Sequence, residues 1–183
     1  ISFKINKGQT LAIIGATGSG KTTFISLIPR FYDATEGEVL VDGINVKDYK
    51  FDTLYDKLGY VTQKAVLFAG SIRENVFFGE SAAPETDEEL KNAIELSQAE
   101  EFVDKLPDGT EHMISQMGRN VSGGQKQRLS IARALSRKPE ILVFDDSFSA
   151  LDYKTDAKLR EGLNEKLKET TKIIVAQRIS TIR

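Results

Sequence analysis

The chain has 183 residues, of which 40% are hydrophobic and 28% are charged, and its formal net charge is −2. That length and composition fit one globular domain with a sizeable core. The near-neutral charge argues against a dedicated nucleic-acid-binding protein, which is usually strongly basic. The chain has no cysteine, which excludes disulfides and thiolate chemistry, and its single histidine, His112, disfavours a histidine-based metal site. No apolar run approaches the ~20 residues of a membrane-spanning helix, and the N-terminus does not resemble a signal peptide.

In the first third of the chain, short apolar runs bounded by turn residues predict strands. These strands are Phe3–Ile5, Thr10–Gly15, Glu38–Val41 and Leu58–Thr62, with a helix from Lys21 to about Ile28. Because the chain begins inside a strand-like stretch and stops at Arg183 in what resembles the first turn of a helix, we expect it to be part of a longer protein.

The middle of the chain is predicted to be helical. Helices are expected at Ser71–Phe78, Thr86–Ser97, Gln98–Leu106 and Ser122–Arg137, and Thr86 with Glu89 forms a possible capping box. Strands return at Ile141–Phe144 and Lys172–Ala176, on either side of an amphipathic helix at Lys154–Glu169. Strands alternate with helices at both ends, which predicts an α/β fold with a parallel sheet. Residues 1–63 and 138–183 would form this core, and residues 64–137 a helical insertion.

A glycine-rich segment after the second strand carries the strongest chemical signal. Gly15–Thr22 fits G-x-x-x-x-G-K-[ST], the pattern of a P-loop. Glycines let the backbone fold tightly, so that its N–H groups point at phosphate oxygens. Lys21 would reach the β- and γ-phosphates, and the Thr22 hydroxyl would bind Mg²⁺. The predicted ATP-contacting residues of this loop are Gly15, Ala16, Thr17, Gly18, Ser19, Gly20, Lys21, Thr22 and Thr23.

A second signal is the acidic residue that follows the apolar run Ile141–Phe144. Asp145 follows this run directly, and loops at the carboxyl ends of parallel strands form the ligand-facing edge of a sheet. Asp145 could hold Mg²⁺ directly or through water, or could be an ordinary aspartate that starts a turn. The phosphate loop favours the metal role.

A third motif narrows the family. The segment Val121-Ser122-Gly123-Gly124-Gln125, which runs into a helix, resembles the signature segment of ABC ATPases, with valine in place of the commonest leucine. Its serine and glycines would form a helix N-terminus with free backbone donors. In that family the segment closes over the ATP held by a partner domain, so that two ATPs lie between two domains. The resemblance covers essentially the whole chain and implies the P-loop NTPase fold of ABC ATPases, with an inserted helical subdomain.

Other positions agree with this resemblance. Gln63 lies where the family has a glutamine that contacts Mg²⁺ and the attacking water, and Asp152 lies in a segment that resembles the loop crossing the dimer interface. The segment Val66–Val76 resembles the stretch of exporter-type domains that meets the coupling helices of the transmembrane domain. Leu67, Phe68 and Phe77 would suit such a docking surface, or would be plain core residues.

Two departures from the family pattern affect hydrolysis. Most active ABC domains have a glutamate where this chain has Asp146, and a histidine where it has Gln177. The shorter carboxylate would sit ~1 Å farther from the water, which is a displacement that can cost on the order of 10²-fold in rate. The glutamine amide can donate a hydrogen bond but cannot carry charge. Each change could be tolerated variation, yet both weaken the same step.

The resemblance therefore implies an ATP-binding and ATP-hydrolysing motor domain of an ABC-type membrane exporter, with its own site weak in hydrolysis. The expected ligands are ATP and Mg²⁺, and the expected partners are a second ABC ATP-binding domain, expected to be a different subunit, and a transmembrane domain, with no nucleic acid. The location implied is the cytoplasmic face of the cell membrane. The alternatives are a non-hydrolysing regulatory ATP-binding module and a soluble ABC ATPase of DNA repair or translation.

Overall fold

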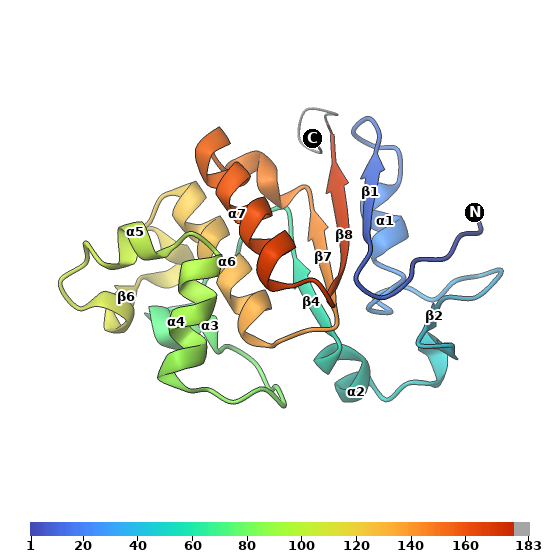
Figure 1. The fold of residues 1–183 in the computed structure, drawn as a ribbon, viewed down its shortest axis with the longest axis horizontal. Helices are drawn as coiled ribbons and strands as arrows, with labels where there is room; N and C mark the ends of the chain where they lie inside the picture. The colour runs from blue at the N-terminus through green and yellow to red at the C-terminus, as the bar shows by residue number, and fades with distance from the viewer. Residues whose placement is uncertain (178–183) are drawn as a thin grey trace.

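The computed structural model describes residues 1–177 and contains a four-stranded parallel sheet flanked by helices (Figure 1). The strand order is β1 (Thr10–Ile14), β8 (Thr171–Ala176), β7 (Ile141–Asp145) and β4 (Leu58–Val61). The predicted α/β parallel sheet is confirmed. Residues 178–183 of the predicted core, with the helix start expected near Arg183, lie outside the described residues.

The central strands are apolar because both faces of the sheet are covered. Successive side chains of β7 point to opposite faces, so Leu142 and Phe144 join the larger core cluster, whereas Val143 joins a smaller cluster on the other face with Ile25. Lys172 in β8 is a buried polar exception. Its buried Nζ donates to the carbonyl oxygens of Leu167 and Thr170 at 2.6 and 3.1 Å.

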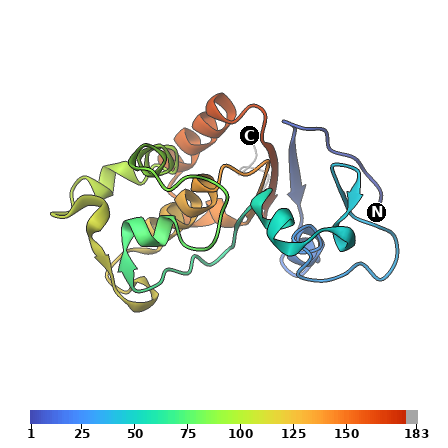
Figure 2. The same ribbon diagram turned by 90° about the horizontal axis from the view of Figure 1, so that it is seen from below.

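Helices cover the two faces and one end of the sheet. Helix α1 (Lys21–Ile25) lies on the β1 side, and α6 (Gly123–Ser136) and α7 (Tyr153–Lys166) lie on the other (Figure 1). The shorter helices α3 (Ile72–Val76), α4 (Asp87–Leu96) and α5 (Glu100–Val103) gather beyond α6, as Figure 2 shows from below. No helix within residues 1–177 is long and apolar enough to span a bilayer.

Several predicted elements differ in extent or kind. Phe3–Ile5 is not a strand, because no neighbouring strand pairs with it in the described structure, and Phe3 instead packs its ring 5.7 Å from that of Phe24. The helix predicted at Gln98–Leu106 is only α5, since Gln98 adopts a left-handed conformation with φ 59°. Thr86 caps α4 as predicted, but the Glu89 carboxylate accepts from Lys138 Nζ instead of completing the box.

One helix and three short strands near the edges were not predicted. Helix α2 (Phe51–Asp56) carries Phe51, Leu54 and Tyr55 at the i, i+3, i+4 spacing of a helix, a short signal that was missed, and only Leu54 is buried. The two-residue strand β2 (Leu40–Val41) lies within the strand predicted at Glu38–Val41 and pairs antiparallel with β3 (Ile44–Asn45), which was not predicted. The antiparallel pair β5 (Gly70–Ser71) and β6 (Met113–Ile114) was not predicted either. These strands are too short to leave a periodic signal.

Candidate nucleotide-binding site

Four strands deliver the predicted site residues to one edge of the sheet. β1 ends at the glycine-rich loop, β8 ends next to Gln177, β7 ends with Asp145 and is followed by Asp146, and β4 is followed after one residue by Gln63. All neighbouring pairs in this sheet are parallel, so these carboxyl ends meet at one edge. The sheet thus gathers residues that lie far apart in the chain.

The glycine-rich loop folds around the ammonium group of Lys21. Lys21 Nζ donates to the carbonyl oxygens of Gly15 and Ala16 at 2.6 and 2.7 Å and contacts the Ser19 hydroxyl at 3.3 Å. Gly18 and Gly20 have φ values of 81° and 86°, which side chains rarely adopt. A Cβ atom on Gly15 would lie 2.8 Å from Ser19 Oγ. The loop therefore needs its glycines, and its cation is positioned to receive phosphate.

Thr22 and Asp145 meet between α1 and β7. The Thr22 hydroxyl donates to Asp145 Oδ1 at 2.9 Å. Burial raises the pKa of the Asp145 carboxyl above its ordinary value, and the hydrogen bond from Thr22 opposes this shift. No cluster of three or more histidine, cysteine or acidic residues suited to a metal occurs among residues 1–177. Two protein oxygens fit Mg²⁺, which usually combines one or two protein ligands with phosphates and water.

Asp146 is held by two glutamine amides. Its Oδ2 accepts from Gln177 Nε2 at 2.6 Å and from Gln63 Nε2 at 3.1 Å. The oxygen of the Gln177 amide in turn accepts from the Thr17 hydroxyl at 3.2 Å. A chain of hydrogen bonds thus joins the phosphate loop to the carboxylate that follows β7. Gln63, predicted to contact both metal and water, directs its amide nitrogen to this carboxylate.

The backbone of Asp146 is left-handed, with φ 50° and ψ 24°. Its N–H donates to the Val175 carbonyl oxygen at 3.1 Å, and its own carbonyl oxygen accepts from the Ser149 hydroxyl at 2.7 Å. Aspartate tolerates this conformation better than most residues. The turn that follows is the 3₁₀ helix η4 (Ser147–Ala150).

The signature segment begins helix α6. The Ser122 hydroxyl accepts from the Gln125 backbone N–H at 3.3 Å, and the Gln125 side-chain oxygen accepts from the Ser122 N–H at 2.8 Å. This is a complete capping box. A Cβ atom on Gly123 would meet no atom within 4 Å, so the helix start is open on that side. Within the described chain, no hydrogen bond joins Val121–Gln125 to the phosphate loop.

Asp152 caps α7 in the same way. Its two carboxylate oxygens accept from the backbone N–H and hydroxyl of Thr155 at 3.0 and 2.7 Å. Both bonds lower the pKa of the Asp152 carboxyl, and the bond from the Thr155 hydroxyl has the larger effect. The residue is exposed, which leaves it accessible to another chain.

The residues expected either at a docking surface or in the core divide between the two, and the partly buried Phe77 packs against the core cluster. Leu67 is only 2% exposed and belongs to the core. Phe68 is exposed, and its ring stacks on that of Phe78 with centroids 4.0 Å apart. The Arg133 guanidinium lies 5.4 and 5.5 Å from these two rings, and burial lowers its pKa to about 10. A cavity of about 290 Å³ opens beside Phe78 and Arg133.

The sequence did not predict the side-chain contacts of Thr17 and Gln127. Thr17 was expected only as part of the phosphate loop, and Gln127 only as part of a helix. The Thr17 side chain binds Gln177, and the buried Gln127 donates from Nε2 to the Thr62 carbonyl oxygen at 3.2 Å, next to Gln63. For Gln127 the available signal is a polar residue on the buried face of an amphipathic helix. For Thr17 there is no signal, since its partner lies 160 residues away.

A parallel sheet whose first strand leads into a lysine-centred loop, beside an acidic strand end, defines a P-loop nucleotide-binding domain. A family model described as ABC transporter matches residues 1–149. The chain therefore belongs to the ABC transporter family.

Individual relatives agree. ABC transporter B family member 21 of Arabidopsis thaliana is 44% identical over 182 residues, which cover all of this chain and 14% of that protein. A putative multidrug export ATP-binding/permease protein of Staphylococcus aureus is 43% identical, with 31% of its length covered. The structure of a bacterial Atm1-family ABC exporter with ATP bound superimposes with a TM-score of 0.88 and 36% identity, over 96% of this chain and 30% of that one. The chain thus spans less than a third of the length of these relatives.

Proposed function

We propose that this chain is the ATP-binding and ATP-hydrolysing domain of an ABC-type membrane exporter. The observation that carries the proposal is the cluster at the carboxyl edge of the sheet, where Lys21 lies inside its loop and the Thr22 hydroxyl meets Asp145 at 2.9 Å. Lys21 and the backbone of residues 15–23 would hold the phosphates. Thr22, Asp145 and Gln63 would hold Mg²⁺, which when bound neutralises charge on the phosphates.

The site of this chain is proposed to be weak in hydrolysis. Asp146 stands where the family has a longer acid, and its Oδ2 already accepts from two amides, at 2.6 and 3.1 Å. Both amides occupy acceptor positions of this oxygen, so less of the carboxylate is free to accept a hydrogen bond from the attacking water. Gln177 would orient Asp146 without moving protons itself.

The domain is proposed to work as a sandwich dimer with a second ABC domain, expected to be a different subunit. Residues Val121–Gln125 would close over the partner's ATP, and Asp152 would lie at the interface. The open start of α6 at Gly123 and the exposure of Asp152 support this arrangement. The chain would then contribute to hydrolysis mainly at the partner's site.

The exposed Phe68 and Phe78 pair beside Arg133 is proposed to meet the coupling helices of a transmembrane domain at the cytoplasmic face of the cell membrane. One curated relative of this chain is named an export ATP-binding/permease protein. A nucleic-acid partner is not proposed, because the formal net charge is −2.

Replacement of Lys21 tests the ATP site. Lys21→Ala should weaken MgATP binding by at least about tenfold, because a charge-assisted bond to phosphate contributes roughly 1.5–3 kcal/mol. Titration with a fluorescent ATP analogue measures this loss. The matched control is Lys7→Ala, which removes an exposed lysine paired with Glu169 at 3.6 Å. Equal affinities of the two variants would contradict the assignment.

A further inference from the structure

We infer that Arg160 is a positioning residue for the turn that carries Asp146. Arg160 lies on α7, and its guanidinium carbon is 4.2 Å from the centroid of the Phe148 ring. Phe148 belongs to η4, the turn that directly follows Asp146, and its ring lies 4.9 Å from that of Phe144 in β7. Arg160, Phe148 and Phe144 therefore form a row of contacts that links α7 to the strand end of the site.

The guanidinium is fixed in its orientation. Arg160 Nε donates to Asp156 Oδ1 at 2.6 Å, and both side chains are 17% exposed. Phe148, underneath, is 2% exposed. A planar cation held this way covers the ring face, which lysine would not do equally well.

The same side chain carries a cost. Arg160 Nη2 is buried and has no hydrogen-bond partner in the described part of the chain, and such a donor costs roughly 1–3 kcal/mol. The other buried side-chain atom without a partner there is Ser147 Oγ, in the same turn. A methionine would fill the space of Arg160 without an unpaired donor. The unpaired donor therefore offsets part of the stability that the Asp156 ion pair and the contact with Phe148 provide.

The turn is joined directly to a residue of the nucleotide-binding site. Asp146 immediately precedes Ser147 and holds a left-handed backbone, so a shift of Phe148 would move the Asp146 carboxylate. The same turn leads into Leu151 and Asp152, which are proposed to reach the partner's site. A displacement of ~1 Å can cost on the order of 10²-fold in rate. This inference rests on the proposed function, because it gives Arg160 a role in ATP turnover.

The experiment compares Arg160→Met with Arg30→Met in the complete exporter with its natural subunits. Arg30 is a matched control, because its guanidinium lies 5.2 Å from the Phe51 ring and Nε pairs with Asp33 at 2.9 Å, away from the turn. For Arg160→Met we expect an unfolding temperature close to that of the wild type, because the lost ion pair with Asp156 is offset by removal of the unpaired donor. We also expect a kcat for ATP hydrolysis lowered by at least about tenfold with little change in KM, because the same turn leads into Leu151 and Asp152, which are proposed to reach the partner's site, where most hydrolysis would occur. The kcat of Arg160→Lys should lie between those of Arg160→Met and the wild type.

Hydrogen exchange gives a second readout that does not need hydrolysis. Peptides covering residues 146–152 should exchange faster in Arg160→Met than in Arg30→Met, while the rest of the domain is unchanged. An unchanged kcat would overturn the inference. So would a fall in kcat that comes with a lower unfolding temperature, which marks a merely structural role. If the wild-type exporter hydrolyses no ATP, the proposed function fails, and unaltered exchange in the turn is then the result that overturns the role of Arg160.

Discussion

Two amides converge on one oxygen of Asp146, and this contact bears on which acid the position accepts. The backbone at Asp146 has φ 50°, a conformation that costs most side chains roughly 1–2 kcal/mol and that aspartate tolerates better. Gln177 and Gln63 reach the short carboxylate at 2.6 and 3.1 Å. A glutamate would extend one methylene past both amides. The shorter acid, its backbone and its amide partners are thus mutually adjusted, and changing the acid alone would disturb that fit.

We therefore predict that Asp146→Glu and Gln177→His act together. The longer carboxylate would reach the attacking water, and histidine would replace the amide that now binds the shorter acid. In the paired complex, the double variant should hydrolyse ATP faster at this site, by on the order of 10- to 100-fold. Phosphate release measures the rate, and a partner subunit with a disabled phosphate loop isolates this site.

The single variants are the controls for that experiment. Asp146→Glu alone should gain less than the double variant, because Gln177 would still compete for the carboxylate. No increase in the double variant would mean that these two positions do not limit hydrolysis at this site.

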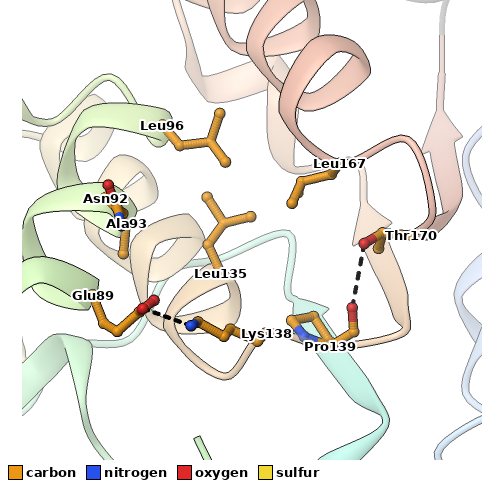
Figure 3. Close-up of a pocket in the computed structure, with 9 residues that line it drawn as sticks. All are labelled: Glu89, Asn92, Ala93, Leu96, Leu135, Lys138, Pro139, Leu167 and Thr170. Carbon is orange, nitrogen blue, oxygen red and sulfur yellow. Dashed lines mark hydrogen bonds and ion pairs between the residues drawn. The ribbon is translucent and has the colours of Figure 1, made fainter. Parts of the chain in front are cut away.

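At the scale of elements, the packing between helices is uneven. A cavity of about 310 Å³ lies where α4, the end of α6 and the segment between α7 and β8 meet (Figure 3). Leu96, Leu135 and Leu167 face this cavity, and Glu89 and Lys138 form an ion pair at 2.5 Å on its rim. Leu135 therefore packs fully on one side only. Leu129, on the same helix, is 0% exposed and lies within the core cluster.

This difference predicts unequal costs for the same truncation. Leu129→Ala should reduce the free energy of unfolding by about 3–5 kcal/mol, because it leaves a closed void in a filled core. Leu135→Ala should cost less, about 2 kcal/mol, since its side chain already lacks neighbours on the cavity side. Urea denaturation of the purified chain measures both, provided that the slope of the transition is unchanged. Equal losses would show that the cavity is filled in solution.

The sequence predicted those elements whose signal is local. Strands β7 and β8 are continuous apolar runs, and α6 begins at a serine that completes a capping box three residues on. The wrong strand at Phe3–Ile5 and the missed helix α2 have the opposite cause. The existence of a strand depends on a partner strand, which the local pattern does not show. Helix α2 has six residues, so its i, i+3, i+4 pattern of Phe51, Leu54 and Tyr55 spans little more than one turn and is a weak signal.

The site residues also divide into those predicted by a local motif and those placed by contacts between distant segments. The loop Gly15–Thr22 and Asp145 follow from short motifs, because their chemistry depends on spacing within a few residues. The pairing of Thr17 with Gln177 depends on β1 lying next to β8, which only the strand order provides. The stack of Arg160 on Phe148 depends on where α7 packs. Contacts between distant segments were therefore beyond reach of the sequence alone.

At the scale of the whole molecule, the proposed dimer separates two roles within one chain. Lys21 would serve the ATP bound by this chain, whereas Ser122 would serve the ATP bound by its partner. Each role belongs to a different composite site, so a change in one should leave the other intact. ATP labelling of each subunit reports which subunit binds ATP, and the total rate of hydrolysis reports turnover, so the two roles can be measured separately.

Ser122→Ala tests this separation in the complete transporter. It should leave ATP labelling of this chain unchanged, yet lower hydrolysis by at least about tenfold, because removing one donor that stabilises transferring phosphate commonly costs 10²- to 10³-fold. Ser122 also caps α6, and loss of a cap costs about 1 kcal/mol of stability by itself. Thr86→Ala is the matched control, since the Thr86 hydroxyl caps α4 through the Glu89 N–H at 3.2 Å. Hydrolysis that falls equally in both variants would assign the effect to capping and would contradict a role for Ser122 at the partner's site.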